Sequence, residues 1–120
     1  MFLLGVPDVQ VLQPSYSVLI GNTVTLECTV SATPFQTSVL WQRIVNGVTS
    51  NINTGLNKYS GSTVNTPSLT ISNVDQSDSG NYICTATNSV GTGTSSQTSL
   101  SVTGSKLLVP NYISLNIPSL

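Results

Sequence analysis

Few side chains in this chain of 120 residues could take part in chemistry. It has two cysteines, three Lys or Arg residues, four Asp or Glu residues and no histidine. A serine nucleophile would therefore need a lysine or a carboxylate as its base. The only lysines are Lys58 and Lys106. The sequence predicts that the protein is not an enzyme and has no catalytic residues.

A metal ion or an organic cofactor is equally unexpected. Imidazole ligands are absent, and the thiols are limited to Cys28 and Cys84. Asp75 and Asp78 could contribute to a calcium site, but calcium takes about six to eight oxygen ligands. We therefore predict no metal site and no cofactor.

The low charge excludes further classes of function. Charged residues make up 6% of the chain and its net charge is -1, so it has no basic patch that could hold a nucleic-acid backbone. No apolar stretch approaches the ~20 residues of a membrane-spanning helix. The apolar start, Met1 to Gly5, is too short for the core of a signal peptide. We interpret the chain as a segment of a longer protein.

Both cysteines lie in stretches with a period of two. Apolar residues alternate with polar ones from Val24 to Val30, and Cys28 belongs to the apolar set. From Gly80 to Ala86 the same period places Tyr82 and Cys84 on one face. Each cysteine is therefore expected to point inward from a half-buried strand.

Other segments have the same character. Further strands are expected at Val9 to Leu12, Tyr16 to Ile20, Val39 to Ile44, Val48 to Ile52 and about Thr94 to Val102, and in another strand with Leu69 and Ile71 facing inward. Asn46-Gly47 between two apolar runs predicts a tight type I′ hairpin. Because the only tryptophan, Trp41, must face the core, its neighbour Leu40 is expected to face outward.

Four residues agree in order and spacing with a known family. Trp41 follows Cys28 by thirteen positions, and Tyr82 precedes Cys84 by two. From about Val6 to Thr103 the sequence resembles an immunoglobulin-superfamily domain. The resemblance implies an all-β fold, a two-sheet antiparallel immunoglobulin-like Greek-key sandwich that spans residues 6–103.

The resemblance also assigns structural roles. It implies that Cys28 and Cys84 form a disulfide on which Trp41 packs, and that the Tyr82 hydroxyl binds backbone near Asp78. Within the motif of Asp78, Gly80, Tyr82 and Cys84, the Asp is expected to pair with a basic residue in the first position of the segment Lys58 to Ser62, which resembles the start of strand D in variable-type domains. Here that residue is Lys58, where Arg is more frequent, so the pair is expected to be weaker.

The predicted disulfide bears on stability and location. Closing a loop of about 56 residues stabilises the fold by ~4 kcal/mol in the chain-entropy model. A disulfide forms in an oxidising compartment, so we expect an extracellular location, either secreted or in a cell-surface ectodomain. The alternative is an intracellular protein with two reduced, buried thiols.

Spacing indicates the subtype within the superfamily. The separation of Cys28 and Cys84 leaves little room for the extra strand of variable domains. Gly91 to Thr94 is interpreted as part of the last hairpin, in which Asn88 and Gly91 are expected to have positive φ angles. The intermediate set is therefore favoured over the variable set.

A protein-binding surface is expected on the outward side of the two central strands. The predicted partner-binding residues are Leu40, Gln42, Ile44, Ile83 and Thr85 of that face, together with Phe35 and Asn88 in loops. The predicted partner is a protein ligand or a second copy of the chain. Alternatively, the face is covered or unused and Phe35 caps the core, since single exposed apolar residues are normal.

The end of the chain echoes its beginning. Residues 109–120 resemble residues 6–16 at a spacing of 103, with one inserted residue, which is the length of one immunoglobulin repeat. Residues 104–120 are therefore predicted to be a linker and the first strand of a following repeat. Chance similarity in a serine-rich sequence is the alternative. The chain resembles one repeat of a tandem, hemicentin-like extracellular animal protein.

Two functions are consistent with these features. The first is a non-catalytic extracellular module for protein recognition in cell adhesion or immune recognition. The second is a structural spacer in a tandem-immunoglobulin extracellular or matrix protein.

Overall fold

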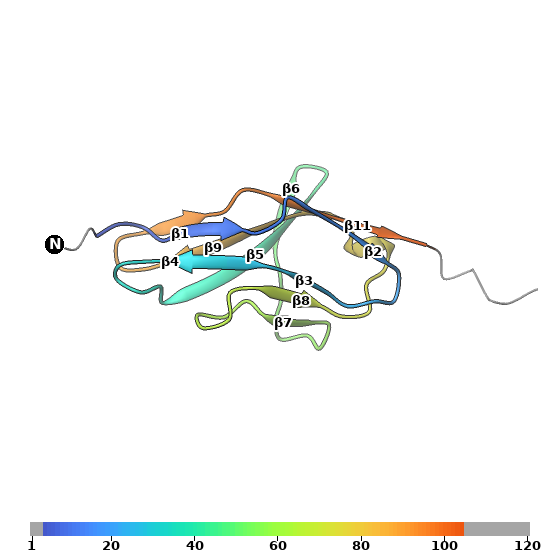
Figure 1. The fold of residues 1–120 in the computed structure, drawn as a ribbon, viewed down its shortest axis with the longest axis horizontal. Coiled ribbons are helices and arrows are strands. Elements are labelled where there is room, and N and C mark those ends of the chain that lie inside the picture. The colour runs from blue at the N-terminus through green and yellow to red at the C-terminus, as the bar shows by residue number, and fades with distance from the viewer. Residues whose placement is uncertain (1–3, 105–120) are drawn as a thin grey trace, which may run out of the picture.

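Residues 4–104 are the part of the chain described by the structure, a computed structural model that consists almost entirely of strands (Figure 1). The elements are β1 (Asp8–Val11), β2 (Ser15–Leu19), β3 (Val24–Leu26), β4 (Cys28–Ser31), β5 (Ser38–Val45), β6 (Val48–Asn51), β7 (Tyr59–Gly61), β8 (Leu69–Ile71), the short 3-10 helix η1 (Gln76–Asp78), β9 (Gly80–Thr87), β10 (Thr92–Thr94) and β11 (Thr98–Thr103).

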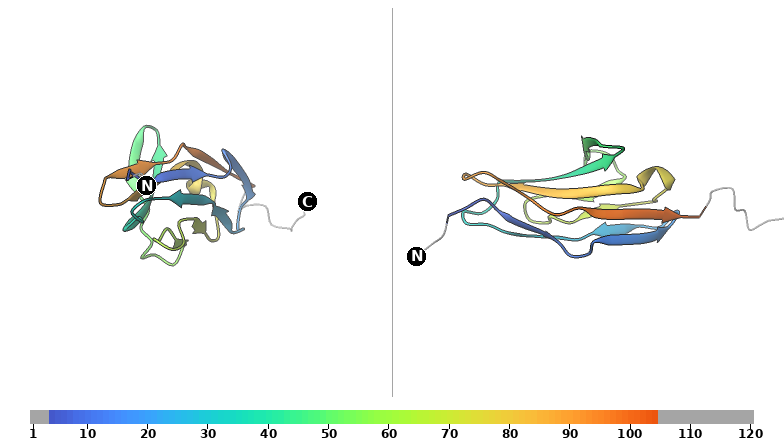
Figure 2. Two further views of the ribbon diagram at one scale, coloured as in Figure 1. Left: turned by 60° about the vertical axis from the view of Figure 1, so that its left-hand side comes forward. Right: turned by 90° about the horizontal axis from the view of Figure 1, so that it is seen from above.

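The strands form two layers, as Figure 2 shows from the side and from above. One layer has the order β2-β11-β9-β5-β6, with β10 also paired to β9. The other contains β1 paired to β4 and the sheet β3-β8-β7, and β3 and β4 follow each other directly on either side of Glu27. The predicted sandwich is confirmed, although β2 and β11 are parallel rather than antiparallel.

The core lies between the layers where the period of two predicted it. Its fully buried side chains are Leu26, Trp41, Leu69, Ile71, Val74, Tyr82 and Cys84. The Trp41 indole N–H donates to the Pro67 carbonyl at 2.7 Å. The largest core side chain is therefore buried without an unsatisfied donor.

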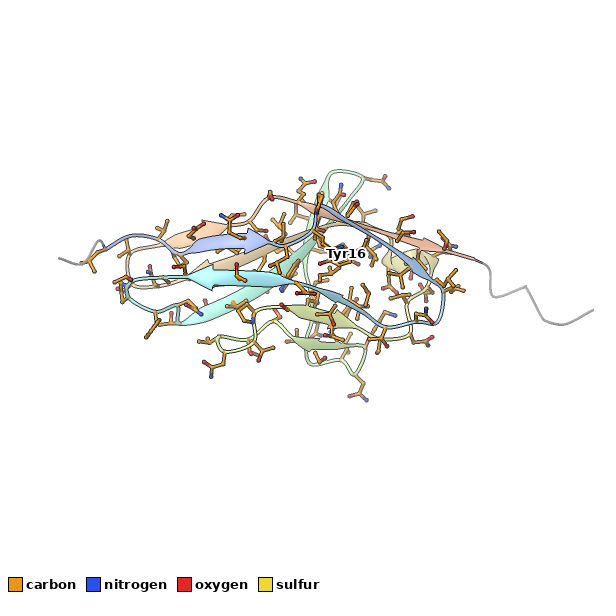
Figure 3. The ribbon with its side chains drawn as sticks, viewed as in Figure 1. Tyr16 is labelled. Carbon is orange, nitrogen blue, oxygen red and sulfur yellow. The ribbon has the colours of Figure 1, made fainter. Side chains whose placement is uncertain are left out.

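Pro14 divides the first strand between the two layers. β1 pairs with β4 in one layer and β2 with β11 in the other, because proline lacks the N–H that a continuous ladder needs. The Tyr16 hydroxyl, labelled in Figure 3, accepts a hydrogen bond from the Glu27 N–H at 3.0 Å. This bond supports the backbone at the break between β3 and β4.

One predicted turn is confirmed. Asn46 and Gly47 have φ angles of 51° and 78°, as a type I′ turn between β5 and β6 requires.

The hairpin expected after β9 is present, because β10 pairs with β9 in antiparallel register. The φ angles that we predicted for it are wrong, since neither Asn88 nor Gly91 has a positive φ. A Cβ atom on Gly93 would lie 1.8 Å from the Pro7 carbonyl oxygen. Gly93 is therefore required for close approach of two backbone segments.

The two ends of the described chain lie at opposite ends of the sandwich (Figure 1). The predicted linker and following strand fall almost wholly outside the described residues. Within residues 4–104, no helix is long and apolar enough to cross a membrane.

Candidate functional site

A capped corner holds the start of β9. The carboxylate of Asp75 accepts from the Ser77 N–H, and that of Asp78 accepts from the Asp75 N–H, each at 2.9 Å. These reciprocal bonds form a capping box that closes η1. The corner therefore directs the chain from η1 into β9.

The predicted side-chain contacts at this corner are present. The Tyr82 hydroxyl donates to the Asp78 carbonyl at 2.6 Å, and the Lys58 ammonium lies 3.0 Å from the Asp78 carboxylate. Lys58 also donates to the Asn73 carbonyl at 3.1 Å. Burial raises the pKa of Tyr82 above its ordinary value, so the phenol remains a neutral donor.

Arg43 is a member of the corner that we did not predict. Its guanidinium donates to the Ser79 carbonyl at 2.8 Å and also to the Ser77 carbonyl. A Cβ atom on Gly80 would lie 3.3 Å from the Arg43 Nε atom, which gives this glycine a packing role. The period of two that places Arg43 on the side of Trp41 is the signal that could have indicated this inward position.

The two cysteines face each other in the core. Both are buried, and their sulfur atoms lie 2.9 Å apart. The contact with the Cys28 sulfur and burial raise the pKa of the Cys84 thiol, so this residue is a poor nucleophile. The disulfide itself stays a prediction.

The outward side of β5 and β9 forms one continuous surface. Leu40 lies opposite Thr85 and Gln42 lies opposite Ile83 in the antiparallel register, and Ile44 lies next to Asn81. Opposite residues share a face of the sheet, and all six are half-buried. We call these six residues the outer face.

The outer face carries no charge. The charged residues of the described part of the chain are Asp8, Glu27, Arg43, Lys58, Asp75 and Asp78. Arg43 points inward from β5, and the other five lie in the second layer or around the corner. The outer face therefore presents apolar groups, a hydroxyl and amides to solvent.

Two polar side chains of the outer face already make hydrogen bonds within the domain. The Thr85 hydroxyl donates to the Leu40 carbonyl at 3.2 Å, and the Gln42 amide donates to the Asn51 side chain at 2.9 Å on β6. These bonds fix the side chains around the apolar groups of Leu40 and Ile83.

Comparison with known proteins decides the family. A model of the immunoglobulin domain matches residues 7–88. The chain belongs to this family. A comparison with curated protein sequences finds no match.

Solved structures of tandem immunoglobulin domains resemble this one. The N-terminal Ig1-2 module of the Drosophila receptor protein tyrosine phosphatase DLAR is 30% identical, with a TM-score of 0.67 over 85% of this chain and 48% of that chain. The N-terminal four Ig domains of Dscam1 isoform 4.4 give 26% identity and a TM-score of 0.63, covering 73% of this chain and 21% of theirs. The chain spans about half the length of the DLAR module.

The structure of titin M4 is matched over its whole length. It is 26% identical with a TM-score of 0.64, and the match covers 85% of this chain and 100% of that chain.

Asn88, one of the residues predicted to bind a partner, is buried in this immunoglobulin domain. Only 4% of Asn88 is exposed. Its amide donates to the carbonyls of Gly5 and Pro34 at 2.8 and 2.9 Å, and its oxygen accepts from the N–H groups of Val90 and Gly91 at 2.9 and 3.1 Å. Asn88 instead ties three chain segments together at one end of the domain.

Phe35 remains available for contact. It is 84% exposed, so it does not cap the core, which was the alternative from the sequence. Within residues 4–104, no group of three or more His, Cys, Asp or Glu side chains could hold a metal ion.

Proposed function

We propose that this immunoglobulin domain is an extracellular recognition module that binds a protein partner, or a second copy of itself, through the outer face. The observation that carries the proposal is the composition of that face: three half-buried apolar side chains on two central strands with no charged residue among them. Charge is depleted in the cores of protein interfaces. The domain therefore acts by contact and not by catalysis.

Three observations support the extracellular and tandem parts of the proposal. The sulfur atoms of Cys28 and Cys84 face each other in the core, as a disulfide formed in an oxidising compartment would need. The similar chains include two-domain and four-domain immunoglobulin arrays, one of them from a receptor. Between β6 and β7 the structure has no further strand, which favours the intermediate set.

A structural spacer is the second candidate. The chain enters and leaves the domain at opposite ends (Figure 2), so each repeat of this kind would add its full length to an array. In this role the outer face would have no partner, and substitutions there would change neither binding nor assembly.

Binding titrations separate the two candidates. Labelled protein is titrated against intact cells, and Leu40→Arg is compared with Ser60→Arg. Ser60 is an exposed residue of β7 in the other layer. We expect saturable binding that Leu40→Arg abolishes and Ser60→Arg retains. Binding that survives Leu40→Arg would refute the recognition role of the outer face.

A further inference from the structure

The strand β4 has a free edge that no other strand of the described chain covers. The Leu12 N–H donates to the Glu27 carbonyl. Backbone groups of successive residues point to opposite sides of an antiparallel strand, so those of Thr29 bind β1 and those of Val30 point away from β1. The N–H and C=O of Val30 have no hydrogen-bond partner within residues 4–104. These groups can accept an added strand.

Pro67 and Ser68 explain why the ladder stops. β8 begins at Leu69 and pairs with β3 and β7 but not with β4, and Pro67 has no N–H to extend the pairing. The Ser68 hydroxyl instead accepts from the Cys28 N–H at 3.0 Å and donates to its carbonyl at 3.4 Å. Past Cys28, the neighbouring chain no longer follows β4.

A groove lies along this free edge. Its volume is about 610 Å³ and its lining is uncharged, formed by Cys28 to Val30, Phe35, Gln36, Val64, Asn65 and Pro67. The Gln36 amide donates to the Val64 carbonyl at 3.0 Å, which connects two segments of its lining. The ring of Phe35 is available at this groove because it is 84% exposed.

The chain itself contains a segment that matches the groove. The sixteen residues after Gly104 carry a single charge, on Lys106, and their sequence alternates apolar Ile113, Leu115 and Ile117 with Ser114 and Asn116. This period of two is typical of a strand with one apolar face. An uncharged segment enters an uncharged groove without leaving a charge unpaired.

The same segment echoes the strand that already pairs with β4. Val109-Pro110-Asn111 resembles Val6-Pro7-Asp8, which leads into β1. The segment therefore resembles in sequence the start of β1, the strand that pairs with β4. Gly104 lies at the end of the domain opposite to the loop that carries Phe35 (Figures 1 and 2). The segment therefore begins far from the groove of its own domain, which favours the groove of another molecule.

We propose that residues 109–117 of one copy add as a strand to the free edge of β4 in a second copy, beneath Phe35. Backbone bonds to Val30 would set the register, and the apolar side chains would enter the groove. The contact joins two different surfaces, so each copy can bind one neighbour at each end and the assembly need not close. This head-to-tail contact is separate from the outer face.

Sedimentation velocity of the full chain at increasing concentration tests the proposal. We expect the mean mass to rise with concentration, and Phe35→Ser and Leu115→Asp each to weaken association by about tenfold or more. Leu56→Ser is the matched control, because Leu56 is 55% exposed and does not line the groove. Circular dichroism checks that each variant is folded.

A peptide experiment identifies the occupant. A labelled synthetic peptide of residues 107–120 is titrated into the Leu115→Asp protein, whose own segment is disabled. We expect saturable binding that a scrambled peptide does not show and that the additional change Phe35→Ser removes. A monomer at every concentration, absent peptide binding, or association abolished by Ile83→Arg and unaffected by Phe35→Ser would overturn the proposal. The last of these outcomes would instead support the outer face.

Discussion

The two sides of β5 and β9 are built from neighbouring residues but differ in what holds them. On the inner side Trp41, Tyr82 and Cys84 are fully buried, and Trp41 and Tyr82 each donate a hydrogen bond to a backbone carbonyl. On the outer side Leu40 and Ile83 are only half-buried. Stability should therefore depend on the inner side and recognition on the outer face.

The largest expected difference is between residues 40 and 41. Trp41→Ala removes the largest core side chain and should lower the free energy of unfolding by about 3–5 kcal/mol. Leu40→Ala, one position away, should cost about 1 kcal/mol or less because its side chain remains half in solvent. Urea unfolding of both variants measures the difference. Equal losses would contradict the assignment of the two sides.

Reduction tests the predicted disulfide between Cys28 and Cys84. If the bond forms, a reducing agent should lower the free energy of unfolding by ~4 kcal/mol, and intact mass should rise by two hydrogens. The double variant Cys28→Ala, Cys84→Ala should unfold identically with and without the reducing agent. Labelling of both thiols in unfolded, unreduced protein would show that the bond is absent.

Tyr82→Phe should have a smaller effect. It removes the hydrogen bond to the carbonyl of the buried residue Asp78 and should lower the free energy of unfolding by about 1–3 kcal/mol. Burial raises the pKa of Tyr82, so at high pH the folded state keeps a proton that the unfolded chain has lost. Stability should fall as pH rises above about 10, the ordinary tyrosine pKa.

Tyr82→Phe is the control that shows whether Tyr82 causes the fall in stability at high pH. The melting temperature of the original protein should fall more steeply with pH in that range than that of Tyr82→Phe. Parallel curves would show that the phenol does not titrate differently in the two states.

Lys58→Met should have the smallest effect on stability. The Lys58 side chain is 31% exposed and that of Asp78 is 4% exposed, and the Asp78 carboxylate keeps its bond from the Asp75 N–H. Loss of a partly exposed pair costs up to about 1 kcal/mol. Thermal unfolding at low and high salt measures this loss of stability. A loss as large as that of Trp41→Ala would contradict this account of the corner.

The sequence was sufficient for the inner side because its signals are local. The period of two around Cys28 and Cys84 follows from the alternation of strands, and the resemblance to the immunoglobulin superfamily added Trp41; together they predicted these core residues correctly. Asn46-Gly47 identified its turn in the same way, because φ preferences act within two residues.

Residues whose roles depend on distant segments were not predictable in this way. Asn88 is buried because Gly5 and Pro34 approach it from far along the chain. Residue 93 must be glycine because the Pro7 carbonyl approaches it closely. The Arg43 guanidinium donates to carbonyls more than thirty positions away. The period of two places Arg43 on the inner side, but no local pattern in the sequence identifies the partners in these contacts.

The most direct test of the central claim compares one residue from each layer. Ile83→Arg places a charge on the outer face, and Ser60→Arg places the same charge on the exposed surface of the other layer. Titration of each labelled variant against intact cells should show saturable binding for Ser60→Arg and none for Ile83→Arg, with both variants folded. Equal binding by the two variants would contradict the account.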